Sequence, residues 1–83
     1  MRITQEAKTS LKREYTLYSH AIAFYKKAIR ELEQKHRLST GVFLKQFASG
    51  KLGDDADYFD WYAFAKLLSE WQKAQSAIGA AIR

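Results

Sequence analysis

Four aspartates near the middle of the chain are the residues whose types most directly invite chemistry. Asp54, Asp55, Asp57 and Asp60 offer carboxylate oxygens, the ligands that calcium takes in proteins. A calcium loop also needs ligands at alternate positions, a mid-loop glycine and a distal glutamate, and this segment has neither the alternation nor the glycine. Carboxylates equally stabilise a helix start, where free N–H groups favour negative charge. We therefore expect a capped helix here, and we predict no metal and no cofactor.

The histidines and serines do not form a recognisable catalytic pattern. His20 and His36 fall on different faces of one predicted helix, so they cannot share a metal ion, and we expect His36 to end an apolar seam. Ser10, Ser19 and Ser39 lack the strand-turn-helix setting of a nucleophile elbow. An enzyme needs a cleft with converging polar groups, and these patterns do not supply one. The sequence therefore predicts a protein that is not an enzyme.

Composition predicts one cytoplasmic domain. A chain of 83 residues is enough for a single domain, residues 1–83, with a modest core. It contains no cysteine, which excludes disulfides and thiolate zinc sites and fits a reducing compartment. The longest apolar runs, such as residues 61–65, fall far short of the roughly 20 residues of a membrane span. We expect no contact with a membrane.

The positive charge is concentrated in the first part of the chain. Residues 1–37 hold nine Lys or Arg against four Glu, which accounts for the whole net charge of +5. A basic stripe is the electrostatic footprint of nucleic-acid binding, but here the glutamates dilute it. No polar recognition helix follows the short second helix, as a helix-turn-helix requires. We expect nucleic-acid binding to be weak or absent, and we keep an accessory nucleic-acid-binding role as an alternative function.

Apolar periodicity predicts one long helix at the start of the chain. Apolar residues with spacings of four and three form the seam Leu11, Tyr15, Tyr18, Ile22, Tyr25, Ile29, Leu32 and His36. This spacing is typical of a helix that packs along one stripe. With Thr4 as its N-cap, the helix is expected at residues 5–37.

Two further helices follow from capping residues and spacing. Ser39 or Thr40 is expected to cap a short helix at residues 40–49, which Gly50 then ends. The third helix is expected at residues 55–82, starting at Asp54 or Asp55, with Asp54 as the first choice of N-cap. The predicted fold class is therefore all-α. The two long helices should form an antiparallel hairpin, with the short helix across one end.

Both long helices carry apolar stripes too wide for one neighbour. On the first helix, Leu17, Ala21, Phe24 and Ala28 lie beside the seam. On the third helix, Leu67, Ala74 and Ala81 flank the apolar row of Phe64, Trp71 and Ile78. The stripes are wider than the ~100° of an ordinary surface helix. Two explanations stay open and are compatible. One is a homo-oligomer that closes a bundle, and the other is a binding face for a different protein.

The segment from Phe43 to Trp71 resembles a known family. It contains F-L-K-Q-F, then G-K-L-G-D-D-A-D-Y-F-D-W-Y-A, then Leu67, Leu68 and Trp71, all after one long helix. This pattern resembles that of small helical antitoxins encoded in prokaryotic type II toxin–antitoxin operons. The resemblance implies a protein that binds and neutralises a small cognate toxin by direct contact. The alternative from another class is a self-associating helical module without a separate partner.

The third helix is where we expect the toxin to dock. Tryptophan buries a large area and is over-represented where binding energy concentrates, and acids at the edge could steer a basic partner. Part of the surrounding aromatic belt must be core, with Phe59 and Tyr62 as further candidate contacts. The predicted partner-binding residues run along one side of this helix: Asp57, Asp60, Trp61, Phe64, Leu68 and Trp71.

Overall fold

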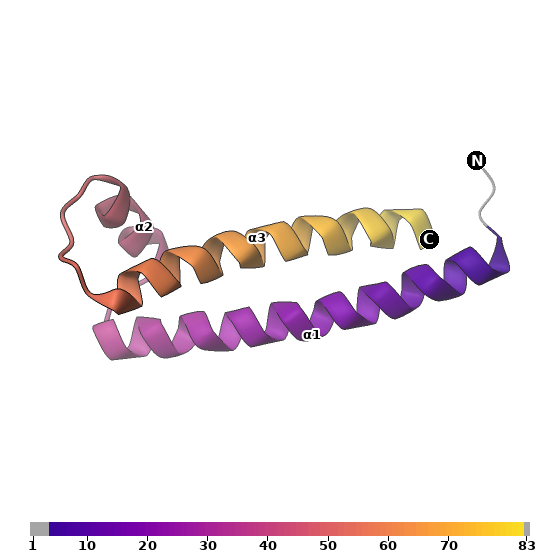
Figure 1. The fold of residues 1–83 in the computed structure, drawn as a ribbon, viewed down its shortest axis with the longest axis horizontal. Coiled ribbons are helices and arrows are strands. Elements are labelled where there is room, and N and C mark those ends of the chain that lie inside the picture. The colour runs from indigo at the N-terminus through magenta and orange to yellow at the C-terminus, as the bar shows by residue number, and fades with distance from the viewer. Residues whose placement is uncertain (1–3, 83) are drawn as a thin grey trace.

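The computed structural model describes residues 4–82 and confirms the all-α prediction. Its helices are α1 (Gln5–His36), α2 (Thr40–Ala48) and α3 (Ala56–Ile82). α1 and α3 lie side by side and run in opposite directions, while α2 crosses one end of the pair (Figure 1). The result is a rod with principal extents of 51 × 21 × 17 Å. In the part of the chain described, no helix has the length and apolar content to cross a membrane.

Both ends of α1 are closed by local hydrogen bonds. The Thr4 hydroxyl accepts from the backbone N–H of Ala7 at 3.1 Å, as its prediction as N-cap requires. Arg37 adopts a left-handed conformation with φ of 51°, and its N–H donates to the carbonyl of Glu33. The N–H of Leu38 donates to the same carbonyl at 3.2 Å. α1 therefore ends at His36, one residue before its predicted end, because Arg37 turns the chain.

α2 begins and ends close to its predicted limits. Its N-cap is Ser39, whose hydroxyl accepts from the N–H of Val42, so Thr40 is the first helical residue. The helix ends at Ala48, one residue early. Gly50 follows with φ of 71°, a conformation that glycine adopts without the steric cost a Cβ would add. The short helix and its following turn thus return the chain toward the start of α3.

The N-cap of α3 is Asp55, so the prediction of Asp54 as the cap was wrong by one residue. The carboxylate of Asp55 accepts from the N–H of Asp57 at 2.9 Å, and its carbonyl accepts from the N–H of Tyr58 at 3.0 Å. The helix accordingly begins at Ala56. Composition alone could not choose between two adjacent aspartates, since either satisfies the same chemical requirement.

The hydrophobic core lies at the end of the rod that α2 covers. Phe43 of α2 and Trp61 of α3 are fully buried, and their rings stack with centroids 4.1 Å apart and planes 2° apart. Ile29 of α1 completes the buried cluster. Partly buried residues from all three helices and from the two connections surround it, namely Leu32, Leu38, Leu44, Phe47, Leu52, Tyr58, Phe64, Ala65 and Leu68. Beyond α2, only α1 and α3 face each other.

Candidate protein-binding surface

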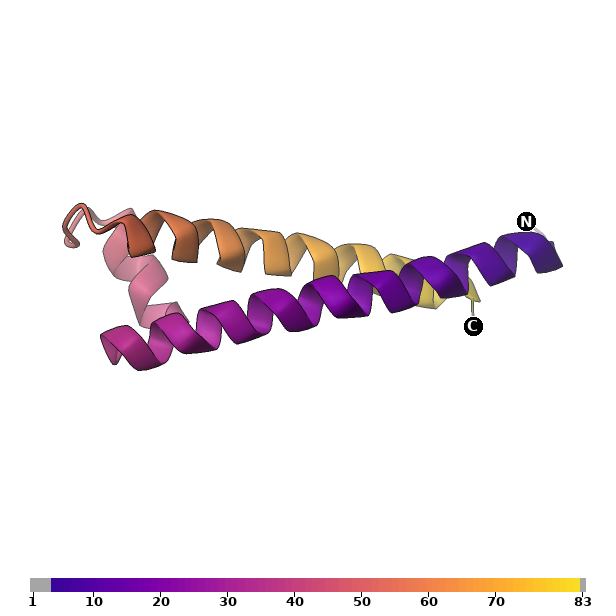
Figure 2. The ribbon, with the colours of Figure 1, turned by 60° about the horizontal axis from the view of Figure 1, so that its bottom comes forward.

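One long side of the hairpin, away from α2, exposes large apolar side chains. Leu17 and Phe24 of α1 are 59% and 63% exposed, and Leu67 of α3 is 41% exposed. Figure 2 shows α1 in front, with the C-terminal end of α3 passing behind it, and α2 at the left end of the pair, farther from the viewer. Helical spacing groups further residues with these three. We call this surface the open side, and it comprises Leu17, Ala21, Phe24 and Ala28 of α1 with Asp60, Phe64, Leu67 and Trp71 of α3.

Both helices contribute to a hollow at one end of the open side. The hollow has a volume of about 240 Å³, with Ala28 and Leu32 on one wall and Phe64 on the other. Glu31 and Asp60 lie at its edge, and both are exposed. The open side is therefore apolar in the middle. At the end nearest α2 it is bordered by the carboxylates of Glu31 and Asp60 and by Lys35, whose ammonium lies 2.7 Å from Asp57.

Trp61 does not belong to this surface, so its prediction as a partner contact was wrong. Its side chain is fully buried, and its indole N–H donates to the hydroxyl of Thr40 at 3.0 Å. That hydroxyl in turn donates to the carboxylate of Glu33 at 2.8 Å. Helical periodicity places Trp61 on the same side of α3 as Phe64. What removes it from the surface is α2, whose Phe43 covers the ring.

The other apolar residues predicted on α3 are shared between core and surface. Phe64 is half-buried against Tyr25 of α1, with ring centroids 5.8 Å apart. Trp71 is also half-buried, edge-on to Tyr18 with centroids 4.9 Å apart. Leu68 packs against the buried cluster. These three side chains join α3 to α1, and only the remainder of each is available to a partner.

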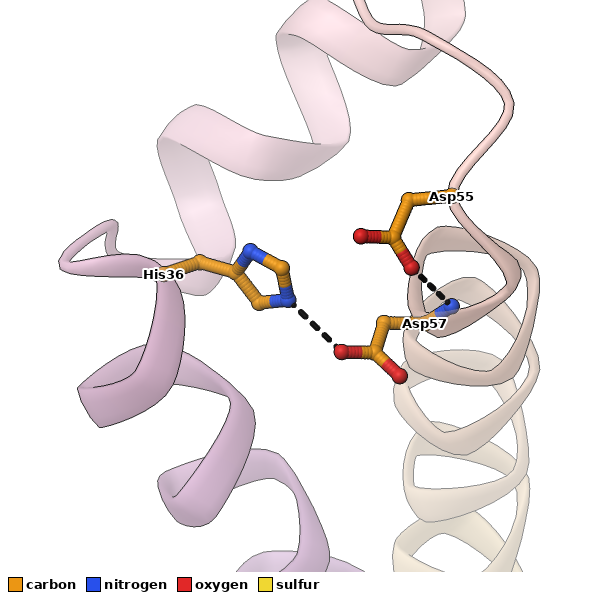
Figure 3. Close-up of side chains that lie close together, drawn as sticks. All are labelled: His36, Asp55 and Asp57. Carbon is orange, nitrogen blue, oxygen red and sulfur yellow. Dashed lines mark hydrogen bonds and ion pairs between the residues drawn. The ribbon is translucent and has the colours of Figure 1, made fainter.

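Asp57 joins the start of α3 to the end of α1. One of its carboxylate oxygens lies 2.7 Å from the ammonium of Lys35. The same oxygen lies 2.9 Å from Nε2 of His36, as Figure 3 shows. The hydrogen bond from Lys35, and then that from His36, hold the pKa of Asp57 below its ordinary value. The same carboxylate raises the pKa of Lys35. Asp57 is thus a link inside the molecule, whereas Asp60, three residues on, stays exposed.

His36, Asp55 and Asp57 form a cluster that the sequence did not reveal. Their potential donor atoms all lie within 4.8 Å of one another, and a histidine with two carboxylates is a donor set that zinc accepts. Each group already has a structural task, because Asp57 pairs with Lys35 and Asp55 caps α3. Spacing within α1 could not find the cluster, since the carboxylates come from the other helix.

A second group of exposed aromatic side chains lies where α2 meets α3. Phe59 and Tyr62 are exposed, and the ring of Phe47 stacks on Tyr62 with centroids 5.0 Å apart. The ammonium of Lys66 lies over the Tyr62 ring, 5.9 Å from its centroid. Part of the surface of this group is therefore already covered by neighbours in the same chain. These residues come from α2 and α3, without a contribution from α1.

Comparison of the chain with protein-family models, with curated proteins and with solved structures finds no match. The likeness to antitoxins therefore rests on the residues from Phe43 to Trp71 alone.

Proposed function

We propose that this protein is an antitoxin-like inhibitor, without catalytic activity of its own, that binds a small toxin through the open side. The observation that carries the proposal is the exposure of Leu17, Phe24 and Leu67 along one side of the hairpin. Contiguous exposed apolar surface of this kind marks interaction sites in soluble proteins. The resemblance to antitoxins supplies the class of partner.

Two carboxylates at one end of the open side favour a partner with basic groups there. Glu31 and Asp60 border the apolar centre at the end nearest α2, and the charge of Lys35 beside them is paired with Asp57. Carboxylates at the rim of an interface accelerate encounter with a basic protein and add little to the affinity once it is bound. Two antiparallel helices with an apolar stripe between them best accept another amphipathic helix. We therefore expect the toxin to present a helix with an apolar stripe and basic residues at one end.

The motif that resembles the antitoxin pattern has mainly a structural task in this proposal. Phe43 and Trp61 form the centre of the core, and Asp55 caps α3. These residues fix how α3 lies against α1, and so they position the open side without touching the partner. The absence of cysteine fits the cytoplasm, where we place both proteins.

Co-expression tests the proposal. The small protein encoded immediately beside this chain should arrest growth when expressed alone, and the parent chain should restore growth and co-purify with it. Phe24→Ala combined with Leu67→Ala should abolish both effects, since it removes two large exposed side chains from the open side. Lys66→Ala is the matched control, because residue 66 neighbours Leu67 but lies off the open side.

Two results would contradict the proposal. One is a neighbouring gene product that leaves growth unaffected. The other is full neutralisation by a doubly substituted chain that circular dichroism shows to be helical and to melt cooperatively.

A further inference from the structure

The part of the open side that belongs to α1 has a symmetric distribution of residue types. Its centre is apolar, with the large side chains Leu17 and Phe24 exposed. Towards the start of α1 the same stripe carries three exposed charged residues, Glu6, Arg13 and Glu14, and towards its end it carries two, Glu31 and Lys35. Each end of the stripe thus offers both acidic and basic side chains.

This distribution is complementary to itself when two copies of α1 run in opposite directions. Consider a two-fold axis midway between Leu17 and Phe24. Leu17 then faces Phe24 of the second copy. Glu6 faces Lys35 of the second copy, whose ammonium also lies 2.7 Å from Asp57 of its own chain. Arg13 faces Ala28 of the second copy, three residues or about 4.5 Å along the helix axis from its Glu31, which an arginine side chain can reach. Symmetry makes every one of these pairs occur twice.

The same axis also brings the α3 helices together. Tyr18 contacts Trp71 and Tyr25 contacts Phe64, so the midpoint of the α1 stripe lies beside the segment from Phe64 to Trp71. Leu67, which is exposed in the single chain, then faces α3 of the second copy near Trp71. The four long helices form a bundle in which every neighbouring pair is antiparallel, an arrangement common in four-helix bundles.

We infer that a second copy of this chain covers the open side of the free protein as an antiparallel dimer. A parallel pairing about the same stripe would place Arg13 beside Arg13 and Glu31 beside Glu31, and like charges in contact oppose association. The antiparallel pairing replaces both repulsions with attractions. The inference concerns the free protein and stands whether or not the partner is a toxin. Where both apply, the toxin must displace the second copy.

Light scattering on the purified free chain tests this inference. The parent should have twice the mass of the 9.6 kDa chain and should dissociate on dilution. Arg13→Glu or Glu31→Arg alone turns two attractive pairs into two repulsive ones, and each should weaken association roughly tenfold. The combined variant Arg13→Glu with Glu31→Arg restores opposite charges and should recover the parental dissociation constant. Lys12→Glu, an exposed charge reversal on a different face of α1, is the matched control and should change little.

A monomer at every concentration would overturn the inference, and so would a combined variant as weak as the single ones. All four residues are exposed, so the variants should keep the helicity of the parent, which circular dichroism checks. The measurement contains only this chain. Its failure therefore leaves the proposed toxin binding untouched, and a failed co-expression test leaves the dimer untouched.

Discussion

Similar apolar side chains are buried in one half of the rod and exposed in the other. Where α2 crosses the hairpin, Phe43 and Trp61 are fully buried. Along the rest of the rod, Leu17 and Phe24 are more than half exposed, although they are as apolar as the core residues. Phe43 and Trp61 lie between α2 and the hairpin, whereas Leu17 and Phe24 lie on the side of the hairpin away from α2, where no third helix covers the wide apolar stripe. Burial in this molecule depends on the arrangement of helices more than on residue type.

Polar links between the helices follow the same division. At the α2 end, Thr40 bonds to Glu33 and Trp61, and Asp57 bonds to Lys35 and His36. Along the rest of the rod, the amide of Gln75 donates to the carbonyl of Tyr15 at 3.1 Å. The α2 end is therefore fixed by packing and by hydrogen bonds together, and it should resist unfolding longest. The half of the rod beyond α2, which we call the open half, should exchange its amide hydrogens first.

The largest expected effect comes from emptying the core at the α2 end. Trp61→Ala should lower the free energy of unfolding by about 3–5 kcal/mol, because it leaves a cavity beside Phe43 and removes a stacked ring. Phe24→Ala in the open half should change it by no more than about 0.5 kcal/mol in the monomer. Chemical denaturation, at concentrations where light scattering finds monomer, measures both. Equal losses would remove the contrast between the two halves.

The next effect tests the polar link at the α2 end. Thr40→Val keeps the shape of the side chain but leaves the buried indole N–H of Trp61 without its acceptor. An unsatisfied buried donor costs about 1–3 kcal/mol, and we expect a loss of unfolding free energy in that range. Thr40→Ser keeps the hydroxyl and serves as the control. If valine were tolerated as well as serine, the link would add nothing beyond packing.

Asp55→Ala should have a smaller effect, about 1 kcal/mol, because it removes the cap of α3 and frees the N–H of Asp57. Asp54→Ala, one residue earlier, should change the unfolding free energy much less. Thermal melting of the two variants side by side decides between the adjacent carboxylates. A greater loss of stability from Asp54→Ala than from Asp55→Ala would show that Asp54, the first choice from the sequence, is the N-cap of α3.

The sequence predicted elements well and contacts between elements poorly. Spacing and capping residues located all three helices, and the limits differ from the structure by a residue, as at Arg37, because left-handed geometry is not visible in periodicity. Trp61 was misplaced because nothing in α3 itself shows that Phe43 covers it. His36 and Asp57 are 21 positions apart, and only the packed hairpin brings them together. Local rules describe one helix at a time, while sites form between helices.

The smallest expected effect is a dependence of stability on pH at the α2 end. The pKa of Asp57 lies below its ordinary 3.8 in the folded chain, so its ion pair stabilises the fold above that pH, and this stabilisation is lost as the pH falls through the lower, folded value. The pKa of Lys35 lies above its ordinary 10.5, so the stabilisation from the same pair is lost again as the pH rises through the raised pKa of the folded chain.

Asp57→Asn should therefore be less stable than the parent at neutral pH. The gap in unfolding free energy between the two should shrink at both pH extremes and stay constant between them. Urea denaturation across the pH range, with Asp54→Asn as the control for loss of a neighbouring exposed carboxylate, measures this gap. Lys35 is largely exposed and Asp57 is partly exposed, so salt should shrink the gap as well, which a cavity or packing defect would not do. A gap that ignores both pH and salt would mean that Asp57 acts through its shape and not its charge. The link between the end of α1 and the start of α3 would then rest on the aromatic contacts of His36 with Tyr58 and Trp61.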